Sequence, residues 1–436
     1  MSLTSLPSTT AAVLYGPRDI RLQNRPLWPP SSGQVQVKVV ATGLCGSDLH
    51  YYSHGRNGDF AVRAPLVLGH ESAGIVTAVS PGSNLHVGQR VAIEAGIFCR
   101  SCPFCLGTSP NSNGKPRYNL CKNMRFCSSA ARFPHVDGTL QKHINHPAYV
   151  LHPIPDDVSF DLAALAEPLS VLIHASRRCG LVDARAPSKQ KVHPQSVMVF
   201  GVGAIGLLAC ALAKHRGASK VVAVDINPTR LEFAKREGFA DDVYCIPPPS
   251  SSTSTSAPLP DACCSSSSTT TTAPTTPREL ADEQLKKAKE GAVAALSHFG
   301  NTDGYDVVYE CTGAESAIQM SIFSASTGGK VMLIGMGTRA AYIPLSTAAL
   351  REVDVLGSFR YADTYPEALE LLCSASKSQP NGTSTSPSLP SLVAKLVTHR
   401  FKLSETSKAF EMLARGVDDQ GGLVLKVVVG SEEDDD

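Results

Sequence analysis

The fold of the second half of the chain is indicated by the stretch Ser196-Val197-Met198-Val199-Phe200-Gly201-Val202-Gly203-Ala204-Ile205-Gly206. A short apolar run leads directly into glycines at G-x-G-x-x-G spacing, and the residues from Leu207 to Lys214 are predicted to form a helix. A second apolar strand, 221–224, ends in Asp225. A strand, a glycine turn, a helix and then an acid about twenty residues further on predict a doubly wound parallel sheet that binds a dinucleotide.

Each element of this pattern has a predicted task. Gly201 serves the tight turn, Gly203 the approach of a pyrophosphate, and Gly206 the contact between helix and strand. The start of the helix offers free N–H groups to the phosphates. Asp225 can accept hydrogen bonds from the ribose hydroxyls and would repel a 2′-phosphate, which favours NAD over NADP. Arg230 could instead hold a phosphate, or pack against the adenine.

Two polar tracts interrupt the second half. The segment from Cys245 to Thr276 is rich in Ser, Thr and Pro, and is predicted to be a disordered surface insertion. Thr276-Pro277 then supplies an N-cap and a first-turn proline for a helix. A second polar insertion is expected from Ser374 to Ser391, and an acidic tail at 431–436. Between the tracts, apolar strands at 306–310 and 330–334 continue the sheet.

The first third of the chain predicts a compact, mostly antiparallel β unit. Its β-branched runs are separated by Gly, Pro and Ser turns and lie at 11–15, 35–40, 74–79 and 89–93. Within this unit Cys45, and His70 beside Glu71, supply a thiolate, an imidazole and a carboxylate. These groups suit zinc with one open, catalytic position. On spacing alone, a buried cysteine and a capping histidine that never meet remain the alternative.

A second metal site is predicted from four cysteines. Cys99, Cys102 and Cys105 have C-x2-C-x2-C spacing, and Cys121 follows a polar loop. Four thiolates can close a structural zinc site with no open position. An iron–sulfur cluster and a zinc ribbon that grips nucleic acid are alternatives, but the flanks lack the basic and aromatic density of a ribbon. The long loop makes Cys121 the weakest of the four predicted ligands.

Composition limits the partners. The chain has 436 residues, a formal charge of +1 and 13 cysteines. A near-zero charge argues against nucleic acid or an acidic membrane surface as the main partner. The sequence shows neither a basic and apolar leader nor an apolar run long enough to span a bilayer, so we expect a cytoplasmic protein. The odd number of cysteines favours metal sites and free thiols over a disulfide framework.

Five motifs together resemble one family. They are the run from Cys45 to Tyr51, Gly69-His70-Glu71, Ala166-Glu167-Pro168-Leu169-Ser170-Val171, the glycine pattern, and REVDVLGSFRY at 351–361. The chain is similar in them to the zinc-dependent medium-chain dehydrogenases, and within these to the sorbitol, xylitol and arabinitol dehydrogenases. The resemblance implies a GroES-like catalytic domain at 1–167 and 359–436, a Rossmann domain at 168–358 with its insertion at about 247–277, and a homotetramer.

The resemblance also implies residue roles. Cys45, His70 and Glu71 correspond to the catalytic zinc ligands, and Glu167 to a second carboxylate that acts through the bound water. Ser47 and His50 are expected to begin a proton relay, with mere hydrogen-bond support as the alternative. The implied substrate pocket contains Tyr51, Phe126, Glu167, Arg360 and Tyr361. The implied cofactor contacts are Gly201, Gly203, Ile205, Gly206, Asp225, Arg230, Gly335, Met336, Ser358, Phe359 and Arg360.

The implied function is zinc- and NAD-dependent oxidation of a sugar alcohol, with D-sorbitol to D-fructose expected first. Xylitol, L-arabinitol, a simple alcohol and threonine are alternative substrates. Many alcohol dehydrogenases of the superfamily have a cysteine where this chain has Glu167, which favours polyols. A zinc-free quinone reductase or lens-type structural protein would lack the ligands Cys45, His70 and Glu71. A zinc-ribbon module that binds nucleic acid is disfavoured by the neutral charge.

Overall fold

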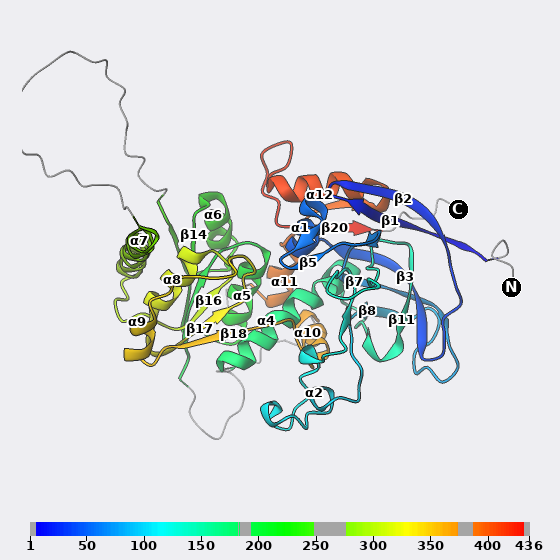
Figure 1. The fold of residues 1–436 in the computed structure, drawn as a ribbon, viewed down its shortest axis with the longest axis horizontal. Helices are drawn as coiled ribbons and strands as arrows, with labels where there is room; N and C mark the ends of the chain where they lie inside the picture. Colours follow the sequence, from blue (N-terminus) through cyan, green and yellow to red (C-terminus); the bar gives the residue numbers. More distant parts are fainter. Residues whose placement is uncertain (1–5, 182, 184–192, 248–275, 374–386, 431–436) are drawn as a thin grey trace, which may run out of the picture.

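The computed structural model describes residues 6–181, 183, 193–247, 276–373 and 387–430. Two main sheets lie beside each other, one in the green and yellow part of the chain and one in the blue and cyan part (Figure 1). The disorder predicted for the Ser/Thr/Pro tract concerns mostly residues 248–275, which lie outside the described residues, as do 374–386 and the acidic tail. No helix among the described residues is long and apolar enough to cross a membrane.

The first sheet has six parallel strands in the order β15-β14-β13-β16-β17-β18. Counted along the chain this is the order 3-2-1-4-5-6 of a Rossmann fold, which confirms the predicted parallel sheet. The strands are β13 (Ser196–Phe200), β14 (Lys220–Asp225), β15 (Asp242–Cys245), β16 (Tyr305–Glu310), β17 (Ala325–Leu333) and β18 (Asp354–Gly357).

Helices cover both faces of this sheet. Successive residues of the central strand β13 point to opposite faces, and both sets are apolar, so each face needs a covering layer. Val197 and Val199 belong to a core shared with α4 and α5, whereas Met198 and Phe200 belong to a core shared with α7 and α8. The helices of this half are α4 (Ala166–Cys179), α5 (Ala204–His215), α6 (Pro228–Arg236), α7 (Pro277–His298), α8 (Glu315–Ser324) and α9 (Leu345–Leu350).

The second sheet has seven strands in the order β12-β8-β7-β3-β20-β19, with β11 also paired to β3. All pairs are antiparallel except β19 with β20, so the mostly antiparallel unit is confirmed. The strands are β3 (Gln34–Gly43), β7 (Glu71–Val79), β8 (Arg90–Ile93), β11 (His143–Pro147), β12 (Leu151–Pro153), β19 (Val397–Lys402) and β20 (Lys426–Gly430). A small sheet of β1 (Ser8–Gly16), β2 (Asp19–Pro26) and β6 (Leu66–Val67) flanks it.

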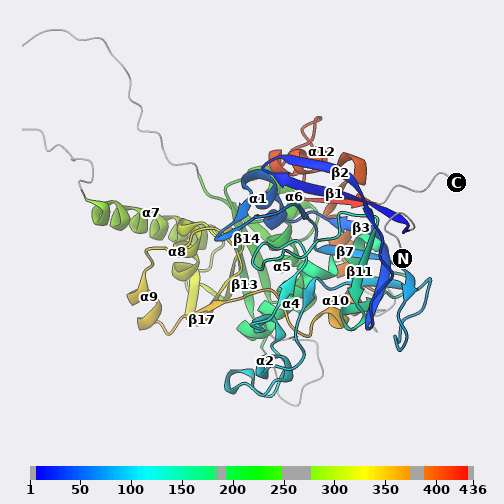
Figure 2. The ribbon, with the colours of Figure 1, turned by 45° about the vertical axis from the view of Figure 1, so that its right-hand side comes forward.

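The C-terminal segment returns to the N-terminal unit. Strand β20 pairs with the end of β3, with Val428 opposite Gly43, and helix α12 (Thr406–Arg415) lies beside β1 and β2 in both ribbon views (Figure 2). The remaining helices and short strands are α1 (Gly46–His54), β4 (Arg56–Asn57), β5 (Phe60–Ala61), β9 (Gly96–Ile97), α2 (Pro103–Leu106), β10 (Arg125–Phe126), α3 (Phe160–Ala164), α10 (Tyr365–Leu372) and α11 (Leu389–Ala394). Helix α4 crosses the domain boundary expected at residue 167, and that boundary stays a prediction.

Two predictions about local structure have different outcomes. The helix expected after Thr276 is confirmed, because the Thr276 side chain accepts from the Glu279 amide and the Glu279 side chain accepts from the Thr276 amide in a capping box. The second insertion, expected to reach Ser391, is wrong at its end. Ser388 caps helix α11, whose Leu389 is buried in the large core, so the polar composition of the tract hid a short amphipathic helix.

Candidate active site

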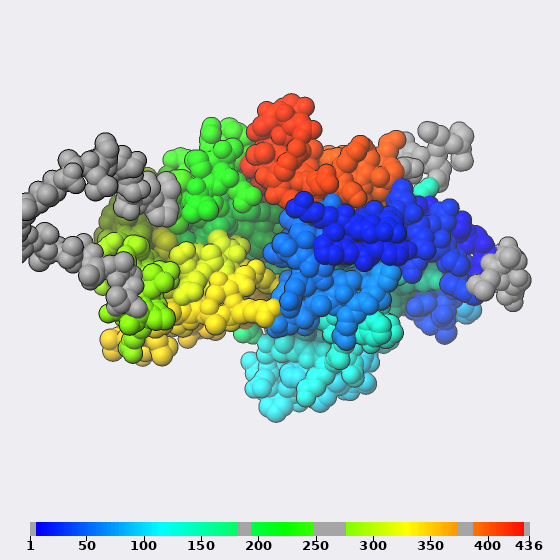
Figure 3. All heavy atoms as spheres, turned by 45° about the horizontal axis from the view of Figure 1, so that its top comes forward, coloured from blue at the N-terminus to red at the C-terminus, as the bar shows by residue number. Residues whose placement is uncertain are grey.

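A pocket of about 350 Å³ lies where the two halves of the molecule meet. The loop after β17, in yellow, reaches across to the blue β4–β5 hairpin (Figure 3). Arg339 of that loop and Asp59 of the hairpin form an ion pair of 2.7 Å. The lining residues are Cys45, Gly46, Ser47, His50, Tyr51, Asn57, Phe60, His70, Glu71, Phe126, Ser128, Ser129, Glu167, Val171, Ile205, Cys311, Thr312, Ile334, Gly335, Met336, Ser358, Phe359 and Arg360.

Three side chains with metal-binding groups converge in this pocket. Cys45 is the residue before α1, and Glu71 is the first residue of β7, directly after His70. One donor atom from each lies within 4.8 Å of the other two, so the three could hold a metal ion. The alternative in which the cysteine and the histidine never meet is therefore wrong. A thiolate, an imidazole and a carboxylate are the donor set that suits zinc, with room for a fourth ligand.

A buried carboxylate orients the histidine. Asp48 is fully buried, and its Oδ1 lies 3.2 Å from His70 Nδ1 while also accepting from the Ser128 hydroxyl. Burial alone would lower the pKa of His70, but Asp48 and Cys45 raise it well above its usual value. With Nδ1 turned toward Asp48, the other ring nitrogen of His70 is left for a metal.

Glu71 is held by a cation from the far end of the chain. Lys426 Nζ lies 2.8 and 2.7 Å from the two carboxylate oxygens of Glu71 and donates to the carbonyl of Leu44 at 3.2 Å. Both side chains are buried, with Lys426 only 3% exposed. A Cβ at Gly43 would lie 2.6 Å from Glu71 Oε2, so this position leaves no room for a larger residue.

Glu167 supplies a second carboxylate to the same pocket. It lies in the first turn of α4 and is almost completely buried. Burial raises its pKa to about 7, and the nearby Glu71 adds to that rise, although His70 and Lys426 act in the opposite direction. A carboxyl group with this pKa can take up or release a proton near neutrality.

Arg360 is a cation of this pocket that interacts electrostatically with Glu167 but forms no ion pair with it. Its guanidinium lies 3.8 Å from the ring centre of Phe126 and 4.8 Å from that of Phe359. It makes no hydrogen bond or ion pair with the residues that the structure describes, and burial lowers its pKa. Tyr51 lines the pocket and its hydroxyl accepts from the Ala130 amide at 3.1 Å, whereas Tyr361 is buried outside the lining.

The glycine pattern forms the turn into α5. Gly201 has φ of 86°, and a Cβ at Gly206 would lie 1.8 Å from the Gly201 carbonyl oxygen. Gly203 caps α5 and has no atom within 4 Å of where its Cβ would be, so a ligand can approach the helix there. Asp225 accepts from the Val202 amide at 2.7 Å, which ties the end of β14 to the turn.

The other predicted residues fall into two groups. Ser47 and His50 line the pocket, as do Ile205, Gly335, Met336, Ser358 and Phe359. The three glycines, Asp225 and Arg230 do not line it but lie at the neighbouring end of the parallel sheet. The Nε of Arg230 is buried and has no hydrogen-bond partner among the described residues. Sequence reasoning missed Asp48, Ser128 and Lys426, of which only Asp48 stood inside a recognised motif.

The four cysteines meet in a separate cluster. Their Sγ atoms lie 3.4 Å apart for Cys102 and Cys105, 3.5 Å for Cys99 and Cys121, and 3.8 Å for Cys99 and Cys105. Cys121 therefore joins the others despite the long loop, and the four could hold a metal ion. Hydrogen bonds from Ser101 lower the pKa of Cys99 to about 5, which favours a thiolate.

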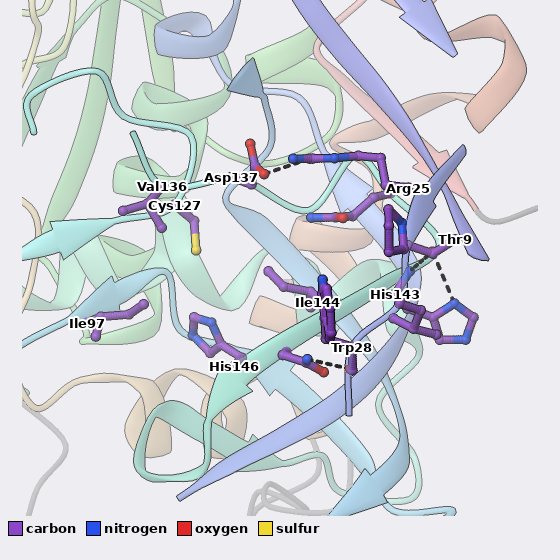
Figure 4. A pocket seen from close by; sticks show the side chains of 14 residues that line it. Thr9, Arg25, Trp28, Ile97, Cys127, Val136, Asp137, His143, Ile144 and His146 are labelled. Carbon is purple, nitrogen blue, oxygen red and sulfur yellow. Dashed lines mark hydrogen bonds and ion pairs between the residues drawn. The ribbon is translucent and has the colours of Figure 1, made fainter. Parts of the chain in front are cut away.

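A second pocket, of about 340 Å³, lies beside strand β11 (Figure 4). Its charged groups are paired with each other, because Arg25 and Asp137 form an ion pair of 2.7 Å. Asn145 donates to the Trp28 carbonyl at 2.8 Å, and His143 Nδ1 lies 3.4 Å from the Thr9 hydroxyl. We assign no ligand to this pocket.

Two family models match parts of the chain. Residues 31–156 match the alcohol dehydrogenase GroES-like domain, and residues 204–254 and 278–374 match the zinc-binding dehydrogenase family. Sorbitol dehydrogenase of Bos taurus is 36% identical over 431 residues, covering 98% of each chain. Sorbitol dehydrogenase of Homo sapiens is 35% identical over 419 residues, covering 96% of each.

Solved structures share the fold. L-idonate 5-dehydrogenase from Escherichia coli is 26% identical, with a TM-score of 0.71 and coverage of 97% of this chain and 98% of that one. The 2R,3R-butanediol dehydrogenase from Bacillus subtilis is 23% identical, with a TM-score of 0.68 and coverage of 97% and 99%, and shows the fold alone.

Proposed function

This chain belongs to the zinc-dependent medium-chain dehydrogenases, in the sorbitol dehydrogenase family, and on that premise we propose that it oxidises D-sorbitol to D-fructose with NAD as the hydride acceptor. It is an NAD-dependent zinc oxidoreductase, and polyols are the substrate class that its relatives support. Xylitol and L-arabinitol are the alternative substrates, ahead of simple alcohols and threonine.

The observation that carries the choice of a polyol is the unpaired Arg360 in the pocket that also contains Cys45 and His70. A guanidinium offers five N–H donors in a fixed plane. A simple alcohol has one hydroxyl and would leave most of these donors to water. A polyol has further hydroxyls beside the one that is oxidised, and these can accept from Arg360.

The donor sets present fit the two cofactors. We propose that Cys45, His70 and Glu71 hold the catalytic zinc, and that Cys99, Cys102, Cys105 and Cys121 hold a structural zinc. When bound, zinc lowers the pKa of the substrate hydroxyl and NAD accepts the hydride. The open space at Gly203 fits the approach of a pyrophosphate to the helix α5, and Asp225 fits the ribose hydroxyls.

The remaining steps belong to side chains of this chain. Glu167, with a pKa of about 7, can hold or release the hydroxyl proton near neutral pH. We propose Ser47 and His50 as the route by which that proton leaves, because both line the pocket. Arg360 and Tyr51 orient the distal hydroxyls, while Phe126 and Phe359 give the guanidinium two aromatic faces to pack against.

The test is the initial rate of NADH formation with D-sorbitol, xylitol and L-arabinitol, with and without a zinc chelator. We expect chelator-sensitive turnover of at least one polyol, with D-sorbitol the best substrate and NADP a much poorer acceptor. Turnover of propan-2-ol or threonine, with no polyol oxidised by zinc-loaded protein, would refute the polyol assignment.

A variant separates the contribution of the arginine. Arg360→Lys keeps a positive charge but removes the planar donor set, and we expect kcat/KM for the polyol to fall about 10- to 100-fold. Arg339→Met is the control, because it removes an exposed arginine that does not line the pocket. Equal kcat/KM in Arg360→Lys and in the wild type would refute the role of Arg360.

We also propose that the protein forms a homotetramer. Strand β18 is an edge of the parallel sheet, and next to it Leu345 and Leu350 of α9 are 70% and 87% exposed. An exposed sheet edge beside apolar side chains is a common association surface. Light scattering of the purified protein would measure the mass. A cytoplasmic location stays a prediction.

A further inference from the structure

The four cysteines lie in a segment with little regular structure of its own. We call residues 99–121 the cysteine lobe; it contains the four-residue helix α2 and two 3-10 turns, Pro110–Ser112 and Tyr118–Leu120. The lobe projects from the body of the molecule, at the bottom of both ribbon views (Figure 2). Such a segment depends on its cysteine cluster to stay folded.

The last turn of the lobe contacts a segment of the pocket wall. Residues 357–363, which we call the arginine segment, contain Arg360 and Tyr361. Asn119 Nδ2 donates to the Phe359 carbonyl at 2.8 Å, and the Asp363 amide donates to the Tyr118 hydroxyl at 2.8 Å. Both lobe side chains are buried. The two contacts lie on either side of Arg360 in the sequence.

Tyr118 is itself anchored to the antiparallel sheet. Its hydroxyl donates to Glu94 Oε1 at 2.9 Å, and Glu94 Oε2 lies 2.7 Å from His152 Nε2. Its ring stacks on Phe98 with ring centres 4.0 Å apart. Burial, together with Glu94, raises the pKa of Tyr118, so the hydroxyl keeps its proton and can serve both partners.

The arginine segment needs outside support because its backbone is strained. Arg360 and Asp363 have φ of 50° and 55°, in the left-handed region that costs a residue with a Cβ of the order of 1 kcal/mol. From the other side, Arg178 donates to the Gly357 carbonyl at 2.8 Å and Arg177 to the Asp363 carbonyl at 2.7 Å, both from α4. The segment is thus held between α4 and the cysteine lobe.

The cysteine cluster is next to the residues that make these contacts. Cys121 directly follows the turn Tyr118–Leu120, and its amide donates to the Tyr118 carbonyl at 2.9 Å. A metal held by Cys121 and the other three thiols would fix that turn. We propose that Tyr118 and Asn119 are positioning residues, through which the cysteine lobe holds the arginine segment and aims Arg360 at the substrate. This inference rests on the proposed binding of the polyol by Arg360.

The experiment uses the full-length, zinc-loaded protein. Tyr118→Phe removes one hydroxyl and keeps the stacked ring, and Asn119→Ala removes the donor to Phe359. Asn111→Ala is the control, because Asn111 is an exposed residue of the same lobe whose main-chain carbonyl, not its side chain, accepts from Arg117. Melting temperature and zinc content show which variants fold. Two independent variants are made so that one that fails to fold does not decide the test.

Two readouts are measured for each folded variant. Hydrogen–deuterium exchange of the peptide that spans 357–363 needs no substrate and should become about two- to tenfold faster in both variants, the loss expected for one hydrogen bond. The KM for the polyol should rise by a similar factor. Asn111→Ala should match the wild type in both measurements.

Unchanged exchange in both variants would overturn the proposal, and so would faster exchange with an unchanged KM for the polyol. A wild-type protein that oxidises no polyol would refute the proposed function instead. In that case exchange alone decides on the positioning: faster exchange in the variants supports it, and unchanged exchange overturns it.

Discussion

Replacing Lys426 by methionine is expected to destabilise the metal-free protein much more than the zinc-loaded protein. In the wild type, both oxygens of Glu71 lie within 2.8 Å of Lys426 Nζ, and the two side chains are buried. Removing one partner of a buried ion pair leaves the other charge uncompensated, at a cost of about 3–5 kcal/mol. In the zinc-loaded protein the metal supplies positive charge beside Glu71, so a large part of that cost should disappear.

If Lys426→Met destabilises the metal-free form more than the zinc-loaded form, the variant must bind zinc more tightly than the wild type does. If the cost falls by about 2 kcal/mol when zinc is bound, the affinity of Lys426→Met for zinc rises about thirtyfold. Urea unfolding of the metal-free and zinc-loaded forms gives the two stability changes, and competition with a chromophoric chelator gives the affinity. Stability is used as the readout because it does not depend on turnover.

The control for this prediction is Lys395→Met. Lys395 pairs with Glu237 at 2.8 Å on the surface, where an ion pair contributes about 0–1 kcal/mol, and it lies outside the pocket. We expect a small and equal change in both forms of this variant. An equal loss of stability in the metal-free and zinc-loaded forms of Lys426→Met, or weaker zinc binding, would refute the reasoning.

Three further predictions follow from the same structure. Gly203→Ala should raise the KM for NAD at least about tenfold, because its Cβ enters the open space through which the pyrophosphate approaches, and it should leave the melting temperature unchanged. Gly206→Ala should instead lower the melting temperature, because its Cβ would lie 1.8 Å from a main-chain oxygen. Burial lowers the pKa of His146 to about 4. Between pH 6.5 and 4 the unfolded chain therefore binds a proton that the folded chain does not, and the free energy of unfolding falls as the pH falls through that window. His146→Gln should remove up to about 3 kcal/mol of this loss, measured by urea unfolding at several pH values. Asp48→Asn should weaken zinc binding about 10- to 100-fold in chelator competition, because Asp48 fixes the ring of His70.

The sequence could predict those parts of the site in which one short motif both forms the local structure and carries the function. The glycines from Gly201 to Gly206 serve one turn, and their spacing alone identifies it. Cys45 and His70 were harder, because their meeting depends on pairing of β3 with β7, which spacing does not reveal. Only the family resemblance joined them before the structure did.

The parts that sequence missed depend on contacts across the whole chain. Lys426 reaches Glu71 because β20 pairs with the end of β3, although 355 positions separate the two residues. A lysine between apolar residues of a C-terminal strand resembles any partly exposed cation. The helix at 389–394 was missed for a similar reason, since the burial of Leu389, Leu392 and Val393 becomes visible only with the core they contact.

The charges of the pocket explain why residues from distant parts of the chain, such as Glu71, Glu167 and Lys426, act together. The pocket gathers the carboxylates of Glu71 and Glu167 and the thiol of Cys45 around His70 in a largely buried space, and the cation that pairs with Glu71 there is Lys426. With that balance the pKa of Glu167 rises to about 7, which means that the protein does not stabilise a second carboxylate charge by itself. A divalent cation next to His70 would supply the missing positive charge and lower that pKa. Glu167, whose charge the protein does not balance, lines the same pocket as Cys45, His70 and Glu71, so the electrostatics and the ligand geometry both favour a bound cation there.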